Sequence, residues 1–440
     1  MSDNKSNSYA SGPGSSRSIR HSLALSATEN AKFIILLLYG LILIGTAFYF
    51  NSPAELLNGM KSISLSESTL ISDYMVLGNI GSAFLNSGLL MLISLAIVKK
   101  AQVNINGSII AAVFTVAGFA FFGKNIFNIW PIIGGVYLYS IYKEEPFSRF
   151  ILVALFGTAL GPLVSLVSFG FGFSTINGLA LGAIFGTLAG FILPPLANHM
   201  VKFHQGYNIY NIGFTAGMTG SLFMAVFRAF NLEAKSQFHF AEGLNDQLGI
   251  YLLVLFISMV IVGLFYNNLS FNGFLKITRH SGRLVSDFIN ADGMGVTFIN
   301  MGTMGIIALS YIVLVGGQIN GPIIGGIFTI VGFAAFGKHP ANVIPILIGI
   351  FLSTQIQAIE AASAGALLAA LFGTTLAPIA GQYGIKAGLL AGFLHLAVVM
   401  NVGYLHGGIN LYNNGFAGGL VAAMLIPIFN NLKQSNPERS

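Results

Sequence analysis

The chain has 440 residues, of which 55% are hydrophobic and only 8% are charged. Soluble domains carry roughly 25% charged residues, so this composition excludes an ordinary soluble enzyme and predicts an all-α polytopic membrane protein. The formal net charge is +6, but the basic residues are scattered singly between apolar runs, which argues against nucleic-acid binding. The chain contains no cysteine, so disulfides, thiolate metal sites and thiol catalysis are excluded.

The N-terminal segment precedes the apolar part of the chain. Residues 1–30 are rich in Ser, Asn and Gly, carry Arg17 and Arg20, and have no apolar core. This pattern indicates a disordered cytoplasmic tail and not a cleaved signal peptide. The first apolar run, Phe33–Phe50, is therefore expected to remain as the first spanning helix.

Apolar stretches divide the rest of the chain into two sets of seven. They fall near 31–50, 78–98, 107–123, 126–142, 148–168, 178–200 and 209–230, and then near 247–267, 293–315, 320–337, 341–358, 362–381, 384–402 and 409–430. Several have only about 16 to 18 residues, which is short for a hydrocarbon core of ~30 Å. The sequence thus predicts about 14 membrane segments, some of them short, broken or re-entrant helices.

A long internal duplication relates the two sets. Blocks of the first half recur 214, 216 and finally 202 residues later. The paired blocks are Ser72-Asp73…Phe84…Asn86…Gly88 with Ser286-Asp287…Phe298…Asn300…Gly302, Asn106-Gly107…Gly123-Lys124…Asn128 with Asn320-Gly321…Gly337-Lys338…Asn342, Phe156-Gly157-Thr158 with Phe372-Gly373-Thr374, and His204…Asn208…Asn211…Phe214 with His406…Asn410…Asn413…Phe416. The shorter last offset predicts an insertion in the first copy, near Ser168–Ser174.

An odd number of segments in each half would insert the second copy upside down. Starting from a cytoplasmic N-terminus, the basic residues predicted to lie inside are Lys99, Lys100, Lys143, Arg149, Lys202, Lys276, Arg279, Arg283, Lys338, Lys386, Lys433 and Arg439, and those predicted outside are Lys61, Lys124, Arg228 and Lys235. This partition follows the positive-inside rule and favours inverted-topology repeats. The expected organisation is a tail (1–30), repeat 1 (31–230), a loop (231–246), repeat 2 (247–430) and a second cytoplasmic tail (431–440), in the cell (inner) membrane.

The sharpest duplicated motif is His-x-Gly-x-Asn-x-Tyr-Asn-x-Gly-Phe, at 204–214 and 406–416. Each copy lies between two apolar runs, where Asn, Tyr and Gly at a helix start can leave backbone groups free for a solute. Non-helical backbone at membrane depth must be buried in protein or line a polar cavity. The motif therefore predicts either a permeation site or a purely structural cap. The candidate solute-binding residues are His204, Asn208, Asn211, Phe214, His406, Asn410, Asn413 and Phe416.

Two further duplicated elements carry polar groups. Gly-Phe-x-x-Phe-Gly-Lys ends at Lys124 and Lys338; a cavity position is conceivable, but an interfacial lysine that snorkels is the favoured interpretation. Asn86 and Asn300 lie within apolar helices, where their amides suit a neutral polar solute or, equally, hydrogen bonding between helices. Both Asn residues are included among the candidate solute-binding residues.

Catalytic and metal-binding patterns are missing from the sequence. There is no Gly-x-Ser-x-Gly, His-Glu-x-x-His or phosphate-binding loop, so no enzyme activity, cofactor or metal is predicted. Asp292, Glu360 and His395 have no equivalent in the other half. Asp292 could serve a coupled cation, although a solvated loop position is favoured. His395 could handle protons, although a hydrogen-bonded core histidine is favoured.

With these blocks in view, the chain resembles a bacterial family of duplicated membrane proteins catalogued as a domain of unknown function. It is also, more weakly, similar to urea transporters, through Phe84-Leu85-Asn86 with Phe298-Ile299-Asn300 and Tyr210-Asn211 with Tyr412-Asn413. The second resemblance implies a pore for a neutral solute between two inverted halves, in a homo-oligomer.

The leading expectation is a channel or facilitator for a small polar, mostly uncharged solute, embedded in the lipid bilayer. It rests on the symmetry, on the duplicated Asn and Tyr motifs and on the lack of a duplicated buried carboxylate. The alternative is a secondary transporter coupled to H⁺ or Na⁺, because inverted repeats with broken helices occur in that class too. A membrane-embedded enzyme, which would need Asp292 and His395 to converge, is a third and less favoured alternative.

Overall fold

The computed structural model describes residues 27–68, 72–234 and 240–434. The regular structure in these ranges is helical, and the isolated antiparallel bridge between Asp73 and Phe122 is the one β-type pairing. Most of the predicted N-terminal tail (1–26) and the end of the second tail (435–440) lie outside the described residues.

Ten helical segments of the described chain are long and apolar enough to cross a membrane. They are α1 (Glu29–Phe50), α4 (Ile80–Lys100), the broken run Phe147–Gly170 that contains α7 (Ile151–Gly157) and α8 (Gly161–Ser165), α9 (Thr175–Phe203), α10 (Asn211–Ala229), α11 (Asn245–Tyr266), α14 (Met294–Leu314), the run Ala364–Tyr383 of α17 (Ala364–Gly373) and α18 (Ala377–Tyr383), α19 (Ile385–Val402) and α20 (Asn413–Gln434). The chain is therefore a multi-pass helical membrane protein.

Shorter helices complete the fold. Four are apolar, namely α5 (Gly107–Phe119), α6 (Ile129–Tyr142), α15 (Gly321–Phe333) and α16 (Pro340–Ile356). The others are α2 (Pro53–Ser64), α3 (Tyr74–Leu77), α12 (Phe274–Ile277) and α13 (Phe288–Asp292). Each apolar stretch predicted from the sequence overlaps a helix of the structure.

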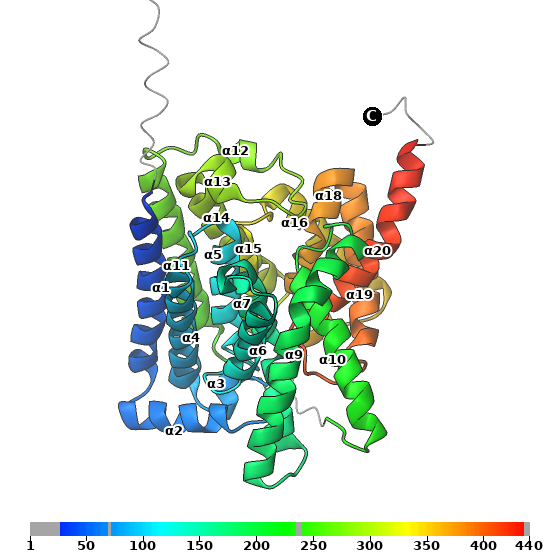
Figure 1. The fold of residues 1–440 in the computed structure, drawn as a ribbon. Coiled ribbons are helices and arrows are strands. Elements are labelled where there is room, and N and C mark those ends of the chain that lie inside the picture. Colours follow the sequence, from blue (N-terminus) through cyan, green and yellow to red (C-terminus); the bar gives the residue numbers. More distant parts are fainter. Residues whose placement is uncertain (1–26, 69–71, 235–239, 435–440) are drawn as a thin grey trace, which may run out of the picture.

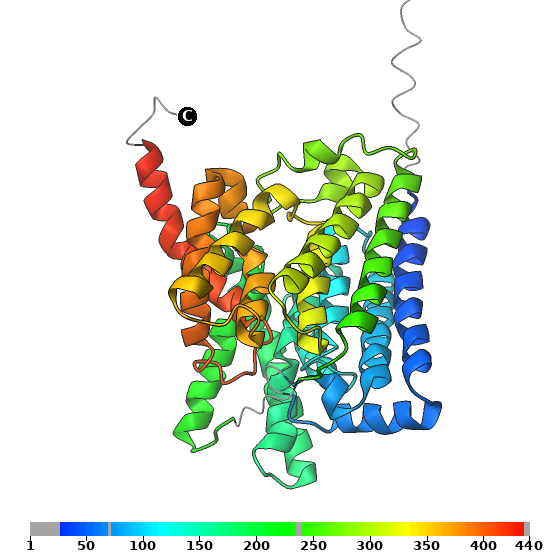
Figure 2. The same ribbon diagram turned by 180° about the vertical axis from the view of Figure 1, so that it is seen from behind.

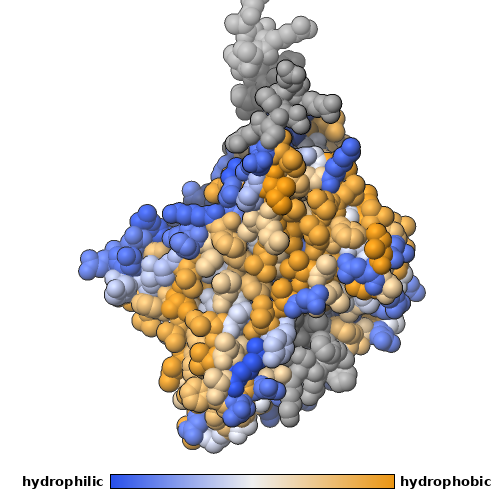
Figure 3. Space-filling model, turned by 90° about the vertical axis from the view of Figure 1, so that its right-hand side faces the viewer, coloured by the Kyte–Doolittle hydropathy of each residue, from blue (hydrophilic) through white to orange (hydrophobic). Residues whose placement is uncertain are grey.

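The outer surface is apolar, as contact with lipid requires. On α11, Ile250, Val254, Ile261 and Phe265 are all exposed, and their spacing places them on one helical face. Figure 3 shows a different side of the molecule, where a broad apolar surface is again bordered by hydrophilic residues. A soluble protein rarely exposes contiguous apolar area of this extent.

Equivalent helices of the two halves make equivalent contacts. The pair α1–α4 packs as α11–α14 does, and α6–α9 packs as α16–α19 does. Two pairs join the halves, because α5 packs against α15 and α10 packs against α20. Figures 1 and 2 show α1 and α11 side by side, with α2 at one end of the bundle and α12 and α13 at the other.

The paired short helices α5 and α15 form the centre of the bundle, and all of their residues are buried. Their backbones approach closely at glycines, since a Cβ at Gly118 would lie 2.8 Å from the carbonyl oxygen of Gly325. Each helix begins at an Asn N-cap, Asn106 or Asn320, whose side chain accepts a backbone N–H. The duplication thus supplies two half-length helices that pack against each other.

The predicted insertion in the first copy is visible as extra helical structure. α9 has 29 residues and α19 has 18. In the first copy, a π-helical turn (Leu166–Gly170) precedes the longer helix, whereas in the second copy Gly384 alone separates α18 from α19. The difference explains the change of offset from 216 to 202.

Candidate functional site

Two equivalent turns follow the short central helices, Phe119–Lys124 after α5 and Phe333–Lys338 after α15. We call them the lysine turns. A glycine with positive φ precedes each lysine, with φ of +74° at Gly123 and +140° at Gly337, a conformation that a residue with a Cβ adopts only under strain. The lysine N–H then donates back to the phenylalanine carbonyl at 3.2 Å in the first turn and 3.0 Å in the second.

Asparagine side chains hold both lysine turns. Asn86 Nδ2 on α4 donates to Lys124 O at 2.9 Å, and Asn300 Nδ2 on α14 donates to Lys338 O at 2.8 Å. Asn128 Nδ2 donates to Gly123 O at 2.9 Å, as Asn342 Nδ2 does to Gly337 O at 2.8 Å. The duplicated Asn residues therefore fix where the two lysines lie.

The lysines themselves are completely buried. Both Lys124 and Lys338 have 0% exposure, so the favoured expectation of interfacial, snorkelling lysines is wrong. The physical reason is the turn, which follows a half-length buried helix and therefore ends inside the protein. Lys338 Nζ donates to Tyr210 Oη and, at 2.6 Å, to Thr374 Oγ1. Lys124 Nζ has no hydrogen-bond partner in the described part of the chain.

A cluster of six aromatic rings lies beside the lysines at the boundary of the halves. Its members are Phe119, Phe156, Tyr210, Phe333, Phe372 and Tyr412. Equivalent ring pairs of the two repeats have equal centroid distances. The distance is 4.6 Å for Phe119–Tyr412 and for Phe333–Tyr210. It is 5.5 Å for Phe119–Phe372 and for Phe333–Phe156. Tyr210 and Tyr412 meet at 5.1 Å. All six rings are buried, so this cluster closes the centre of the protein.

The two His-x-Gly-x-Asn motifs form compact non-helical loops before α10 and α20. Gln205 and Gly206 have positive φ in the first copy, and Gly407 and Gly408 do in the second. His204 Nε2 lies 3.0 Å from Asn211 Oδ1, and the equivalent distance between His406 and Asn413 is 2.9 Å. The loops are thus closed locally by their own His–Asn pairs.

Contacts across the boundary tie each loop to the opposite half. Asn208 Nδ2 donates to Gly415 O at 2.8 Å, and Asn410 Nδ2 donates to Gly213 O at 3.4 Å. Phe214 and Phe416 stack with centroids 6.0 Å apart. The motifs therefore lie together in space, as a shared site would require.

Two cavities flank the aromatic cluster. The first, of about 320 Å³, is lined by Asn211 and by four rings of the cluster, together with Leu284 and Val285 between α12 and α13. The second, of about 500 Å³, is lined by Phe372, Asn413 and, from the connection between α10 and α11, Glu233. Figure 1 places these connections at opposite ends of the bundle.

The cavities are lined by equivalent residues of the two repeats. The shared positions are Leu152 and Leu368, Phe156 and Phe372, Ala197 and Val399, Asn198 and Met400, Val201 and Gly403, Ile209 and Leu411, Asn211 and Asn413, and Ile212 and Asn414. One cavity is thus the repeat image of the other, with the aromatic cluster between them.

The predicted site residues divide into two groups. Asn211 and Asn413 line the cavities. The other eight, which are His204, Asn208, Phe214, His406, Asn410, Phe416, Asn86 and Asn300, are buried and are not among the residues lining these two cavities. The amides of Asn86, Asn208, Asn300 and Asn410 donate to backbone carbonyls, so these side chains have a structural role whatever else they do.

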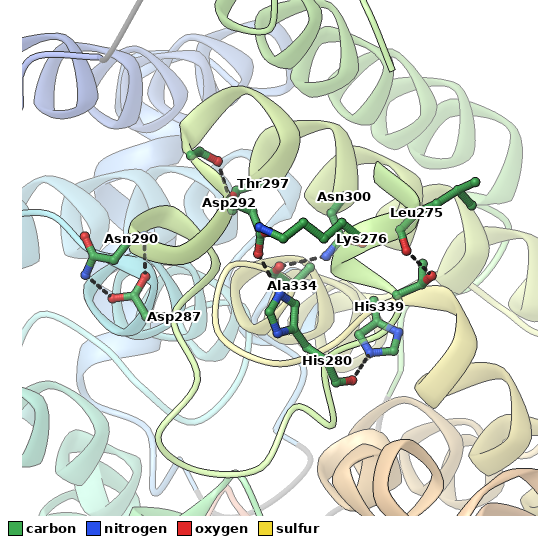
Figure 4. Close-up of polar contacts among 12 residues, drawn as sticks. Leu275, Lys276, His280, Asp287, Asn290, Asp292, Thr297, Asn300, Ala334 and His339 are labelled. Atoms are coloured by element: carbon green, nitrogen blue, oxygen red, sulfur yellow. Dashed lines mark hydrogen bonds and ion pairs between the residues drawn. The ribbon is translucent and has the colours of Figure 1, made fainter. Parts of the chain in front are cut away.

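Residues without a repeat equivalent lie in separate surroundings. Asp292, whose side chain is 2% exposed, pairs with Lys276 at 3.1 Å and with His280 at 2.8 Å (Figure 4); the favoured solvated position is therefore wrong, because the carboxylate is buried against two bases. His395 is buried and bonds to Asn414 Oδ1 at 2.9 Å, as expected for a core histidine. In the described ranges, no group of three or more His, Asp or Glu residues could hold a metal ion.

Sequence reasoning missed the aromatic cluster and the importance of the buried lysines. The signal was present, because Phe156 and Phe372 stand in the duplicated Phe-Gly-Thr block and Tyr210 and Tyr412 stand in the duplicated motif. The sequence did not show how the two repeats pack against each other, which brings Lys338 of repeat 2 into contact with Tyr210 of repeat 1.

Comparison with known proteins gives one family. No curated protein and no solved structure matches the chain. A family profile described as "protein of unknown function (DUF1576)" matches residues 52–229 and 266–431, which covers most of both repeats. The chain therefore belongs to this family of duplicated, helical membrane proteins.

Proposed function

We propose that the protein is a channel or facilitator that lets a small polar solute cross the membrane between its two repeats. The observation that carries the proposal is the pair of repeat-equivalent cavities, one toward each end of the bundle, with a shared aromatic cluster between them. Solute sites commonly form as concave cavities with a few convergent polar groups. Asn211 and Asn413 supply such a group in each cavity.

Inverted topology is part of the proposal. The ten long segments and four shorter apolar helices together would give seven membrane segments per repeat, and an odd number inverts the second copy. The placement of α2 and of α12 with α13 at opposite ends, although they follow the side-by-side helices α1 and α11, supports this reading (Figure 1). With both termini cytoplasmic, the positive-inside rule favours the end that carries α12 and α13 as the cytoplasmic one.

A coupled secondary transporter is the second candidate. The specific observation in its favour is the aromatic cluster, whose six rings are buried and separate the two cavities. A closed centre with a cavity on each side suits alternating exposure of one site, which inverted repeats perform by moving against each other. A facilitator with the same architecture would need the rings to move aside.

Solute flux into proteoliposomes tests both candidates. The panel contains small neutral solutes and small ions, with and without imposed H⁺ and Na⁺ gradients. Equilibration of a solute without any gradient supports the facilitator, and accumulation that needs a gradient supports the coupled transporter. Absence of flux for every solute, with protein shown to be folded and reconstituted, would contradict the proposal.

A further inference from the structure

The two buried lysines lack an acidic counterpart. The ion pairs of the described chain join Glu29 with Lys32, Glu145 with Arg149, and Asp292 with Lys276 and His280. None of them involves Lys124 or Lys338. An isolated buried ammonium carries a desolvation penalty of several kcal/mol in real proteins, on the order of the whole stability margin of a fold. A lysine in such surroundings either loses its proton or takes its negative partner from a bound ligand.

The fold keeps both lysines in place despite this cost. Asn86 and Asn128 hold the first lysine turn, and Asn300 and Asn342 hold the second. A methionine of similar length would fill the same apolar surroundings without burying a charge. A constraint repeated in both halves around a costly group indicates that the ammonium group itself has a use.

We propose that Lys124 and Lys338 bind the permeating solute in turn, and that the solute is a small monovalent anion. This inference rests on the proposed function and gives its substrate class. An ammonium group offers three donors and no acceptor. Lys338 uses donors on Tyr210 and Thr374, whereas Lys124 Nζ donates to no residue in the part of the chain that the structure describes. Lys124 is therefore the site that an anion completes.

Lys338 lies one side chain away from a cavity, and Lys124 lies two side chains away. Tyr210 lines the first cavity and accepts a hydrogen bond from Lys338. Phe372 lines the second cavity and packs on Phe119, whose ring centroid is 5.3 Å from Lys124 Nζ. Rotation of the Tyr210 ring would connect the first cavity to Lys338, and rotation of Phe119 and Phe372 would connect the second cavity to Lys124. The six rings thus separate the anion sites from the two cavities in this closed arrangement.

Each cavity also has an arginine in its lining. Arg149 lines the first cavity and Arg228 lines the second. Arg149 pairs with Glu145 at 3.1 Å, and Glu233 lines the second cavity. Each cavity therefore has both a positive and a negative side chain in or beside its lining, whereas no described acidic residue pairs with the two lysines. This arrangement would give the entrances no net preference for either sign, and protonated lysines would select anions at the centre.

The expectation of an uncharged solute came from the lack of a duplicated carboxylate, and the lysines now change it. A neutral solute such as urea would need acceptors, and the buried atoms Asn86 Oδ1 and Asn300 Oδ1 have no partner among the described residues. Urea is therefore the competing probe in the test.

The test combines binding and flux on the full chain, with chloride, nitrate and formate as anion probes in a gluconate background. The variants are Lys124→Met and, as a control, Lys386→Met, which alters an exposed lysine at the start of α19. At least one anion should raise the thermal unfolding temperature of the wild type and of Lys386→Met. It should not raise that of Lys124→Met, which folds because the change removes only a buried, unpartnered charge.

Flux of anions and of urea into proteoliposomes distinguishes the anion hypothesis from the proposed channel function. We expect the anion that binds to enter proteoliposomes, with a loss of about tenfold or more in Lys124→Met, the equivalent of roughly 1.4 kcal/mol. Urea flux without anion flux would overturn the anion inference and keep the proposed function. No flux of any probe would overturn the proposed function. An anion-dependent stabilisation that is equal in Lys124→Met and the wild type would overturn the lysine site itself.

Discussion

Asn86 holds the backbone of Lys124: the Asn86 Nδ2 atom donates to Lys124 O at 2.9 Å and to Ala120 O at 2.7 Å. Asn300 makes the same two bonds at the end of α15, both at 2.8 Å. Each amide thereby replaces the helical partners that the last carbonyls of a helix lose where the helix ends. Asn86 on α4 and Asn300 on α14 therefore stabilise the ends of α5 and α15.

Replacement of Asn86 or Asn300 by Leu should destabilise the protein. Each change leaves two buried carbonyls without their donor, and a buried group that loses its partner costs about 1–3 kcal/mol. Thermal unfolding in detergent measures the effect. Asn401→Leu is the matched control, because Asn401 is an exposed helical asparagine. Equal unfolding temperatures for Asn86→Leu and Asn401→Leu would contradict the role assigned to Asn86.

The tyrosine hydroxyls should differ although the rings are equivalent. Tyr210→Phe removes an acceptor from the buried Lys338, and we expect a loss of about 1–3 kcal/mol in stability. Tyr412→Phe removes no bond to a lysine, since Lys124 Nζ has no hydrogen-bond partner among the described residues, and should have a smaller effect. Both variants keep the 5.1 Å ring contact. Chemical unfolding of the two purified variants makes the comparison, and an equal loss would show that the asymmetry between the lysines is unimportant.

Much of the fold could be predicted from the sequence, because the length of an apolar stretch and an internal repeat can both be recognised without knowing how the helices pack. The stretch predicted at 293–315 became α14 (Met294–Leu314), and the one at 107–123 became the short α5 (Gly107–Phe119). The lysines were misplaced for a physical reason. The sequence showed a lysine at a break between apolar runs, where snorkelling is the usual solution. That the break lies inside the protein depends on α5 packing against α15, from the other half.

The candidate site was predictable in part for the same reason. The motif predicted either a permeation site or a structural cap, and in the structure its two copies meet, where Asn208 bonds to Gly415 O and Asn410 bonds to Gly213 O. Which of them line a cavity could not be read from order alone. Asn211 and Asn413 do so because they start α10 and α20, while Asn208 and Asn410 point across the boundary to backbone carbonyls.

Adjacent glycines on α6 should respond in opposite ways to substitution by alanine. A Cβ at Gly135 would lie 2.1 Å from Thr187 O on α9, whereas a Cβ at Gly134 would meet nothing within 4 Å. Gly135→Ala should therefore cost about 1–3 kcal/mol through overpacking. Gly134→Ala should be neutral or gain up to ~1 kcal/mol, because alanine favours the helix. Unfolding temperatures that fall equally in both variants would contradict the close α6–α9 contact.

Asp73 should make stability depend on pH. Burial raises the pKa of its carboxyl from 3.8 to about 6, although N–H groups of Ala241, Met75 and Gly321 act in the opposite direction. Because the folded state keeps this proton to higher pH than the unfolded state, its contribution is greatest below about pH 4 and is lost as pH rises through 6. The difference corresponds to about 3 kcal/mol. Unfolding temperatures between pH 4 and pH 8 should show this decline in the wild type but not in Asp73→Asn, and an identical profile in both would contradict it.

Asn211 and Asn413 should affect flux more than folding. Each lines a cavity, closes its loop through a histidine, and donates from Nδ2 to the preceding helix, to Ala197 O at 3.0 Å or to Val399 O at 3.4 Å. Alanine at either position removes the cavity's amide, and we expect flux of the transported solute to fall about tenfold, the equivalent of one lost charge-assisted or polar contact of roughly 1–2 kcal/mol. Proteoliposome flux measures this, with size-exclusion profiles to confirm the fold and Asn401→Ala as the control outside the cavities. Wild-type flux in both variants would leave the two residues a purely structural role, while a larger loss of stability in Asn211→Ala than in Asn413→Ala would agree with its shorter bond to the preceding helix.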